Sequence, residues 1–285
     1  GQVGLLLLED AQALCYALFD DTDIYADCLK GSYQAFVDSG IQADIIRMSQ
    51  IDEYDMLYVP YPVGISDQDM KTLEAWVRNG GTLISEGCFG FFNERGHAME
   101  NAQPNRGFAD VFGCEQEKVH MGPDANKELT IDSVQGRIRA GVYRQTFRPT
   151  CGQAEGRYPN GEVAAVSNLY GKGRTLLVGS MPGYGYHHHA DEATRRWFAS
   201  LLRRAGKQPE ARMPYNGEVT IRLWSGNGEK YAWIFNFADI EQSVEVEFRD
   251  EIGTPVLLRG SKLECAKDGR ITVRIPKKDA AIVKL

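Results

Sequence analysis

The chain has 285 residues, 43% of them hydrophobic and 25% charged, which is the composition of an ordinary globular protein with length for about two domains. The formal net charge of -7 argues against nucleic acid as a partner, because phosphate binding needs clustered Lys and Arg side chains. The apolar segment 3–8 is too short to span a membrane and follows no basic leader, so we expect no membrane partner.

Strands and helices are predicted to alternate in the first part of the chain. Apolar strands are predicted at four places: 3–8, 43–46, 56–59 and 82–85. One helix carries apolar side chains from Tyr25 to Val37 and ends at Gly40, and another begins at the capping pair Ser66 and Asp69. This alternation predicts an α/β fold with a mostly parallel sheet and helices on both faces.

The region after Gly107 is predicted to be richer in strands. A short helix over 108–112 is followed by predicted strands at 128–131, 142–148, 162–167 and 175–179. Gly171-Lys172-Gly173 has the composition of a hairpin turn between the last two strands. A final helix over 190–204 is predicted to end at Gly206, with Pro209 preventing its continuation.

A change of pattern around 207–216 predicts a domain boundary and divides the chain into domains 1–210 and 211–285. Beyond it, short segments alternate apolar and polar side chains, as in Val219, Ile221 and Leu223. This period of two predicts antiparallel strands, roughly seven of them, forming a small all-β sandwich.

An aromatic row lies in the second predicted domain: Trp224, Tyr231, Trp233, Phe235 and Phe237. Such a row could stack against a sugar. The last four members share one parity along the chain, however, and packing in the core of the sandwich is the favoured interpretation.

Several short motifs occur in a characteristic order. They are Tyr54-Asp55 before Leu57–Pro60, Ala75–Val77 leading to Gly80–Leu83, Asn93-Glu94, Phe108–Gly113 before an acidic strand, Gly171–Arg174 leading to Gly179, and Ala205-Gly206 with Pro209. In this order they resemble the C-terminal half of the β-galactosidases of glycoside hydrolase family 42, across nearly the whole chain. The resemblance implies a trimerisation domain with the flavodoxin-like fold of class I glutamine amidotransferases, then a C-terminal β-sandwich, in a homotrimer.

The catalytic barrel of that family has no counterpart in this sequence. The resemblance implies a barrel with two catalytic glutamates, and such a barrel needs about 250 residues. Retaining hydrolysis uses two carboxyl groups about 5 to 5.5 Å apart, and no such pair can be nominated here, so we assign no catalytic residue. Either the chain is a fragment of a longer enzyme with an upstream catalytic barrel, or it is a stand-alone descendant that does not hydrolyse glycosides.

Cys88 is the nucleophile candidate, because it follows a predicted strand where amidotransferase-like folds place a cysteine on a sharp turn. Two features depart from the amidotransferase pattern: Glu86 occupies the position where that turn has Gly, and no clear helix follows Cys88. A thiolate also needs a base, and His187, His188 and His189 lack the glutamate that the resemblance implies two residues after the catalytic histidine. A structural thiol is therefore favoured.

Metal and cofactor sites are not predicted. The six cysteines lack the paired spacings of a zinc ribbon or a disulfide framework, which favours a reducing, cytoplasmic location. Neighbouring side chains in the triple histidine point in different directions, so a metal site there is disfavoured. The glycine-containing segments 171–173 and 183–186 lack the strand-then-helix context of a nucleotide site, and the loop expected after the first strand begins with Glu9.

Three functions compete at this point. The leading hypothesis is a non-catalytic scaffold that builds a homotrimer of a β-galactosidase-like glycoside hydrolase. The first alternative is a stand-alone amidotransferase-like enzyme or small-molecule binder, with a pocket at the carboxyl ends of the strands formed by Glu9, Glu86, Cys88 and Phe89. The second is an accessory module that binds carbohydrate.

Overall fold

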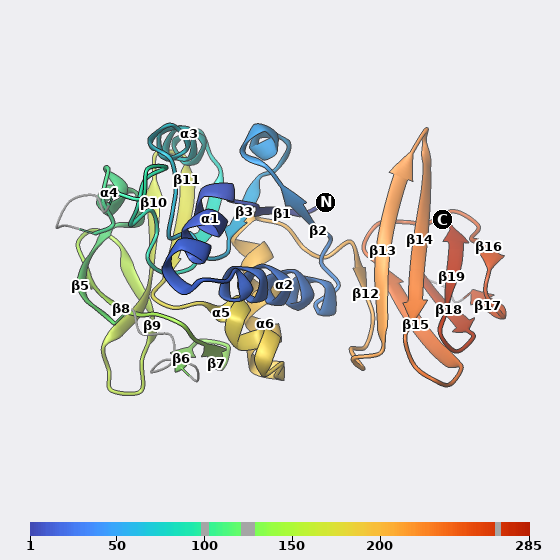
Figure 1. Ribbon diagram of the computed structural model, residues 1–285. Helices are drawn as coiled ribbons and strands as arrows, with labels where there is room; N and C mark the ends of the chain where they lie inside the picture. Colours follow the sequence, from blue (N-terminus) through green and yellow to red (C-terminus); the bar gives the residue numbers. More distant parts are fainter. Residues whose placement is uncertain (98–102, 121–128, 266–268) are drawn as a thin grey trace. The chain divides into compact units, whose positions relative to one another are not determined.

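The computed structural model describes residues 1–97, 103–120, 129–265 and 269–285, which form two compact units (Figure 1). The N-terminal unit contains residues 1–35 and 43–207, and the C-terminal unit contains residues 36–42 and 208–285.

A mixed sheet is the centre of the N-terminal unit. Its strands are β1 (Val3–Leu6), β2 (Ala43–Ile46), β3 (Met56–Val59), β4 (Thr82–Ser85), β6 (Leu129–Ser133), β7 (Gly136–Ala140), β9 (Gln153–Arg157), β10 (Val163–Tyr170) and β11 (Gly173–Val178). Their order is β2-β1-β3-β4-β11-β10-β9-β6-β7. The pairs from β2 to β11 are parallel and those from β11 to β7 are antiparallel, so the prediction of a mostly parallel sheet holds for only one half.

The change of direction in the sheet follows from a hairpin. β10 and β11 pair antiparallel with Tyr170 opposite Gly173, which leaves Gly171 and Lys172 as a two-residue turn. Gly171 has φ +58°, a conformation that glycine adopts without steric cost, so the predicted hairpin is confirmed. The strand predicted over 128–131 corresponds to β6, and Glu128 lies outside the described residues. A further antiparallel pair joins β5 (Cys114–His120) to β8 (Arg144–Pro149).

The helices differ from the prediction at two places. Their bounds are α1 (Glu9–Phe19), α2 (Asp23–Asp38), α3 (Asp67–Arg78), α4 (Phe108–Phe112), α5 (Pro182–His188) and α6 (Glu192–Leu201), with 3₁₀ turns η1 (Met48–Glu53) and η3 (Leu202–Ala205). The expected loop after the first strand is helix α1, whose weak apolar pattern leaves only Ala11 and Cys15 buried. Helix α5 is likewise unpredicted. No helix formed by the described residues is long and apolar enough to cross a membrane.

Helix α3 begins and ends as the sequence predicts. The Oγ of Ser66 accepts a hydrogen bond from the Asp69 backbone N–H at 3.0 Å, which satisfies one of the unpaired donors of the first turn. Met70, Leu73 and Val77 are buried along one face. The amphipathic spacing therefore sets both the position and the orientation of this helix.

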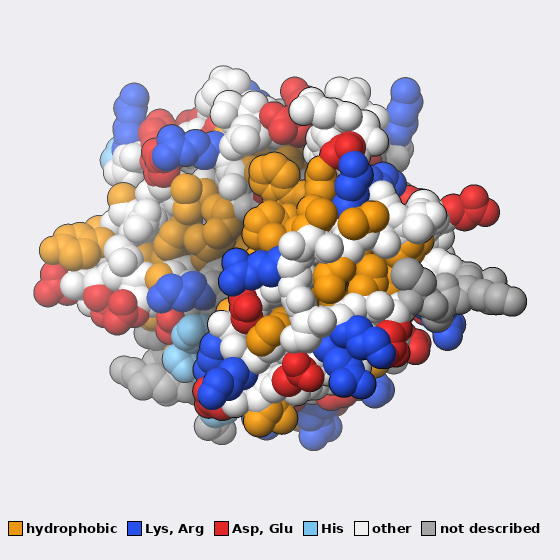
Figure 2. Space-filling model, turned by 90° about the vertical axis from the view of Figure 1, so that its right-hand side faces the viewer, with side chains coloured by type: hydrophobic (Ala, Val, Ile, Leu, Met, Phe, Trp, Pro, Cys, Tyr) orange, Lys and Arg blue, Asp and Glu red, His pale blue; other side chains and the backbone are white. Residues whose placement is uncertain are grey.

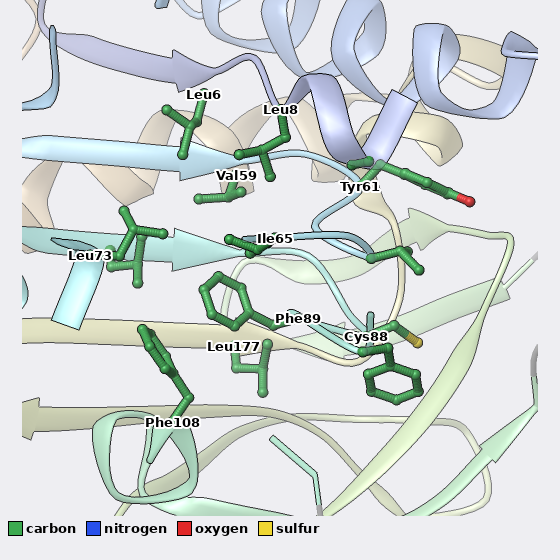
Figure 3. Packing of buried hydrophobic residues seen from close by; sticks show 14 of the residues in the cluster. Leu6, Leu8, Val59, Tyr61, Ile65, Leu73, Cys88, Phe89, Phe108 and Leu177 are labelled. Carbon is green, nitrogen blue, oxygen red and sulfur yellow. The ribbon is translucent and has the colours of Figure 1, made fainter. Parts of the chain in front are cut away.

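One hydrophobic core covers the parallel half of the sheet. Leu6 of β1, Val59 of β3 and Leu177 of β11 are buried in the same cluster (Figure 3). Helices α3 and α4 contribute Leu73 and Phe108 to it. The cluster extends to the carboxyl ends of the strands, where the predicted site residues lie.

The C-terminal unit consists of two antiparallel sheets around its own core. One sheet has the order β12-β15-β18-β17 and the other β13-β14-β19-β16. Their bounds are β12 (Ala211–Arg212), β13 (Val219–Gly226), β14 (Glu229–Asn236), β15 (Gln242–Phe248), β16 (Val256–Arg259), β17 (Lys262–Cys265), β18 (Arg270–Ile275) and β19 (Asp279–Lys284). Side chains from both sheets, such as Ile234 and Val246, fill the core between them.

The aromatic row is a correction to the sequence interpretation. Ala232, Ile234 and Asn236 are the buried members of β14, so the opposite parity faces away from the core. Trp233 and Phe237 are 38% and 55% exposed. The prediction that the row packs in the core of the sandwich is wrong, because alternation decides which positions share a face but not which face is buried.

Candidate functional site

The segment after β4 turns sharply at Cys88. Cys88 has φ +60°, which is uncommon for a residue with a Cβ and is the backbone form found where nucleophiles sit on a strained turn. Its backbone N–H donates to Oε1 of Gln145 at 2.8 Å, which holds the turn against strand β8. Figure 3 shows Cys88 just past the end of a strand, among buried side chains. The turn therefore has the shape of a nucleophile site.

The surroundings of Cys88 do not activate its thiol. The side chain is fully buried, and burial alone raises the pKa of the Cys88 thiol. A nucleophilic cysteine needs a nearby positive charge, a base or a helix N-terminus to stabilise its thiolate. Burial therefore favours the protonated thiol at neutral pH, and a structural role for Cys88 stays a prediction.

Glu86 is a buried carboxylate that joins three segments. Its Oε1 accepts from the Tyr58 hydroxyl at 3.0 Å and the Gly183 N–H at 2.7 Å, and its Oε2 accepts from the Tyr61 N–H at 2.9 Å. Burial raises the pKa of Glu86 to about 7, and these three donors oppose that shift. The carboxylate thus links the region after β3 and the first turn of α5 to the end of β4.

The four predicted pocket residues do not meet at one opening. Phe89 is buried against Phe108 and Phe112, with ring centroids 4.7 and 5.1 Å apart. Glu9 is exposed at the start of α1, where its Oε1 lies 3.2 Å from Nη2 of Arg47. Glu86, Cys88 and Phe89 are thus inside the core, and only Glu9 faces solvent.

A hollow does exist at the carboxyl ends of β1 and β2. Its volume is about 230 Å³, and its polar lining includes Glu9, Asp10, Arg47 and Asp69. Burial raises the pKa of Asp10, and the charges of Asp69, Glu94 and Glu9 raise it further. Carboxylates outnumber the single Arg side chain, so the hollow is unsuited to a phosphate group.

Sequence reasoning missed Asp10, Arg47 and Asp69 in this lining. A signal was present for each: Asp10 follows the first strand, Arg47 follows the second, and Asp69 lies in the first turn of a helix that follows the third. All three positions lie at the strand ends where open α/β sheets place their ligands.

Two of the three consecutive histidines lie close to the carboxylate of Asp27. Nε2 of His187 lies 3.4 Å from Oδ1 of Asp27, and Nε2 of His188 lies 3.0 Å from Oδ2 of the same residue. Among the residues that the structure describes, no group of three His, Cys, Asp or Glu side chains could hold a metal ion.

Cysteine labelling tests the placement of Cys88. In the native protein at neutral pH, we expect iodoacetamide to modify the exposed Cys151 and to leave Cys88 unmodified, because Cys88 is enclosed and protonated. Peptide mass spectrometry measures both sites, and unfolding in urea should make both reactive. Labelling of native Cys88 at a rate near that of Cys151 would contradict this placement.

Comparisons with known proteins give a consistent result. Residues 12–208 match the family model described as the β-galactosidase trimerisation domain. The β-galactosidase GalA of Bacillus licheniformis is 24% identical over 243 residues, which cover 83% of this chain and 34% of that protein. The β-galactosidase BbgII of Bifidobacterium bifidum is 28% identical over 162 residues, which cover 53% of this chain and 23% of that protein. The match therefore spans about a third of the length of the first of these curated relatives and about a quarter of the second.

A solved structure extends the similarity to both units. The β-galactosidase of Bacillus circulans sp. alkalophilus matches the whole chain with a TM-score of 0.77 at 17% identity, and the match covers 41% of that enzyme. Identity this low establishes a common fold and nothing more.

Proposed function

The chain belongs to the family of β-galactosidase trimerisation domains, and on that premise we propose that it is the scaffold that joins three copies of a β-galactosidase-like glycoside hydrolase. In this proposal the hydrolysis of terminal β-D-galactosides takes place in a catalytic barrel that precedes the present sequence. The observation that carries the proposal is the family match over 12–208. The curated relatives, whose names describe β-galactosidases, are about three times as long as the part that this chain matches.

The site geometry supports a structural role for the end of β4. A turn with the shape of a nucleophile site contains a buried, protonated thiol, and the carboxylate two residues earlier has three hydrogen-bond donors of its own. No observation favours the stand-alone amidotransferase-like enzyme over this interpretation. Cysteine labelling, described above, separates the two.

The finer description of the fold is part of the proposal. The parallel half of the sheet, β2-β1-β3-β4-β11, supports a flavodoxin-like arrangement of the class I glutamine amidotransferase type for residues 1–210. The two sheets that share one core support a separate C-terminal sandwich for residues 211–285. In the assembled enzyme, we propose that the first domain forms the trimer contacts.

Light scattering coupled to size-exclusion chromatography tests the scaffold. We expect a particle with three times the 31.8 kDa mass of one chain, dissociating only on dilution, because the matched family model is described as a trimerisation domain. We also expect no hydrolysis of o-nitrophenyl β-D-galactoside. A monomer at every concentration tested, or hydrolysis that co-purifies with the chain, would refute the proposal.

A further inference from the structure

The exposed aromatic row of the C-terminal unit has no role in the proposed trimer scaffold. Figure 2 shows hydrophobic side chains at several places on one face of the molecule. In the C-terminal unit, three members of the row are well exposed: Trp224 at 70%, Phe237 at 55% and Trp233 at 38%. Single exposed apolar residues are common on soluble proteins, but a contiguous aromatic patch marks a binding surface.

The rings along β14 form a track of nearly parallel ring planes. The rings of Trp233 and Phe235 have centroids 6.3 Å apart with an interplanar angle of 28°, and those of Phe235 and Phe237 are 6.4 Å apart at 15°. Tyr231 has the same parity at the other end of the strand. With a rise of about 3.4 Å per residue, the track from Tyr231 to Phe237 is about 20 Å long, which is long enough for several linked sugar rings.

The neighbouring strands leave this track open beside Phe235. On β19, the small side chain of Ala280 lies opposite Phe235, and Ile282 lies opposite Trp233. On the other side, Thr220 of β13 lies opposite Phe235. The cross-strand neighbours of Phe235 are therefore small, whereas Arg222 lies opposite Trp233 and Lys284 lies opposite Tyr231 on the same face.

A hollow of about 300 Å³ lies at the Tyr231 end of the track. Tyr231 lines it together with its cross-strand neighbour Trp224. Its charged lining consists of Glu210, Lys230, Asp250 and Glu251. Nζ of Lys230 lies 3.7 Å from Oδ2 of Asp250, so one carboxylate is already balanced and the two glutamates give the hollow a negative excess.

These features together select the chemistry of the ligand. Carboxylates accept hydrogen bonds from hydroxyl groups, and the negative excess disfavours phosphates, nucleotides and acidic polymers. Aromatic faces attract the C–H groups that a sugar ring presents on one side, and the galactose ring gathers such groups opposite its axial hydroxyl. The exposed row of rings and the concave, acidic end thus match a neutral chain of sugars.

We propose that the C-terminal unit binds a neutral oligosaccharide, with sugar rings stacked along Tyr231, Trp233, Phe235 and Phe237 and one end of the chain in the hollow beside Trp224. The surface then holds polysaccharide near the trimer without taking part in bond cleavage. The identity of the sugar as galactose rests on the proposed function. The proposal that sugar rings stack on this surface rests only on the exposed aromatic side chains.

Calorimetric titration of the full chain with β-1,4-linked galactotetraose and with cellotetraose tests the proposal. We expect binding of at least one probe, a change in tryptophan fluorescence on binding, and about a tenfold larger Kd for Trp233→Ala and Trp224→Ala. Leu169→Ala is the matched control, because Leu169 is 73% exposed on β10 of the other unit. It should bind as the unsubstituted protein does, and circular dichroism should show that all three variants are folded.

Three results would overturn the proposal. The first is no binding of either tetrasaccharide by the folded protein. The second is binding that the two tryptophan substitutions leave unchanged. The third is a loss of oligomeric mass in Trp233→Ala without any sugar binding, which would make the row an interface between copies of the chain. A monomer that binds the probes would refute the trimer scaffold and leave this surface intact, so the two failures are distinguishable.

Discussion

Replacing Gly31 with Ala should lower the free energy of unfolding by about 2 kcal/mol, although the substitution improves helix propensity. Gly31 lies inside α2, where Ala is favoured over Gly by about 1 kcal/mol in an isolated helix. A Cβ at this position would overlap the carbonyl oxygen of Gly183 in α5 and would come within 2.9 Å of the Cβ of His187. Because a backbone carbonyl moves only with its helix, overpacking of about 3 kcal/mol outweighs the gain.

Urea-induced unfolding followed by circular dichroism measures this effect. Lys30→Ala is the matched control, because Lys30 is the exposed neighbour in the same helix and its replacement improves propensity without a contact. We expect the control to unfold at the same urea concentration as the original protein or slightly above it. If Gly31→Ala were as stable as Lys30→Ala, the close approach of α2 to α5 would be wrong.

The second large effect concerns the pH dependence that Glu86 confers. Its pKa is raised from the ordinary 4.5 to about 7 because the carboxyl group is buried. Between these two pH values the folded protein therefore binds a proton that the unfolded chain has released. The resulting stabilisation is fully present below pH 4.5, is lost as the pH rises to about 7, and amounts to about 3 kcal/mol.

A comparison with Glu86→Gln isolates this contribution. The amide does not titrate, so the difference in unfolding free energy between the original protein and the variant should fall by about 3 kcal/mol from pH 5 to pH 8. Glu86→Gln should also be less stable at pH 5, because its amide nitrogen cannot accept a hydrogen bond from the N–H of Tyr61 or Gly183, whereas both oxygens of the protonated carboxyl group can. Glu117→Gln, an exposed site on β5, serves as the control and should leave the pH profile unchanged. A difference that does not vary with pH would show that Glu86 does not titrate in this range.

Local signals in the sequence gave the secondary structure of the parallel region. Helix α3 follows from its capping residue and the spacing of Met70, Leu73 and Val77, and each of these features acts within one or two turns. The hairpin at Gly171 follows equally from local turn chemistry. Helix α1 was missed because its burial is slight, so the apolar period on which prediction depends is weak.

The sequence indicated that Cys88 follows a strand, but it did not indicate that Glu86, Cys88 and Phe89 are buried. The position of Cys88 after β4 follows from the order of strands and helices. The three donors to Glu86 belong to Tyr58, Tyr61 and Gly183, which come together only when the sheet and α5 assemble. Tyr58 and Glu86 are 28 positions apart in the sequence, and Glu86 and Gly183 are 97 positions apart. No local sequence pattern predicts contacts over such separations.

The sequence by itself determined the strand and helix periods, the turn at Gly171 and the alternation along β14, because each depends on side chains a few residues apart. The tertiary structure alone decided that half of the large sheet is antiparallel, that Glu86 lies in the core, and that the Trp233 face of β14 is the outer one. The physical reason is that the burial of a face depends on which element packs against it. A sequence pattern shows which residues share a face, but it does not show which other element covers that face.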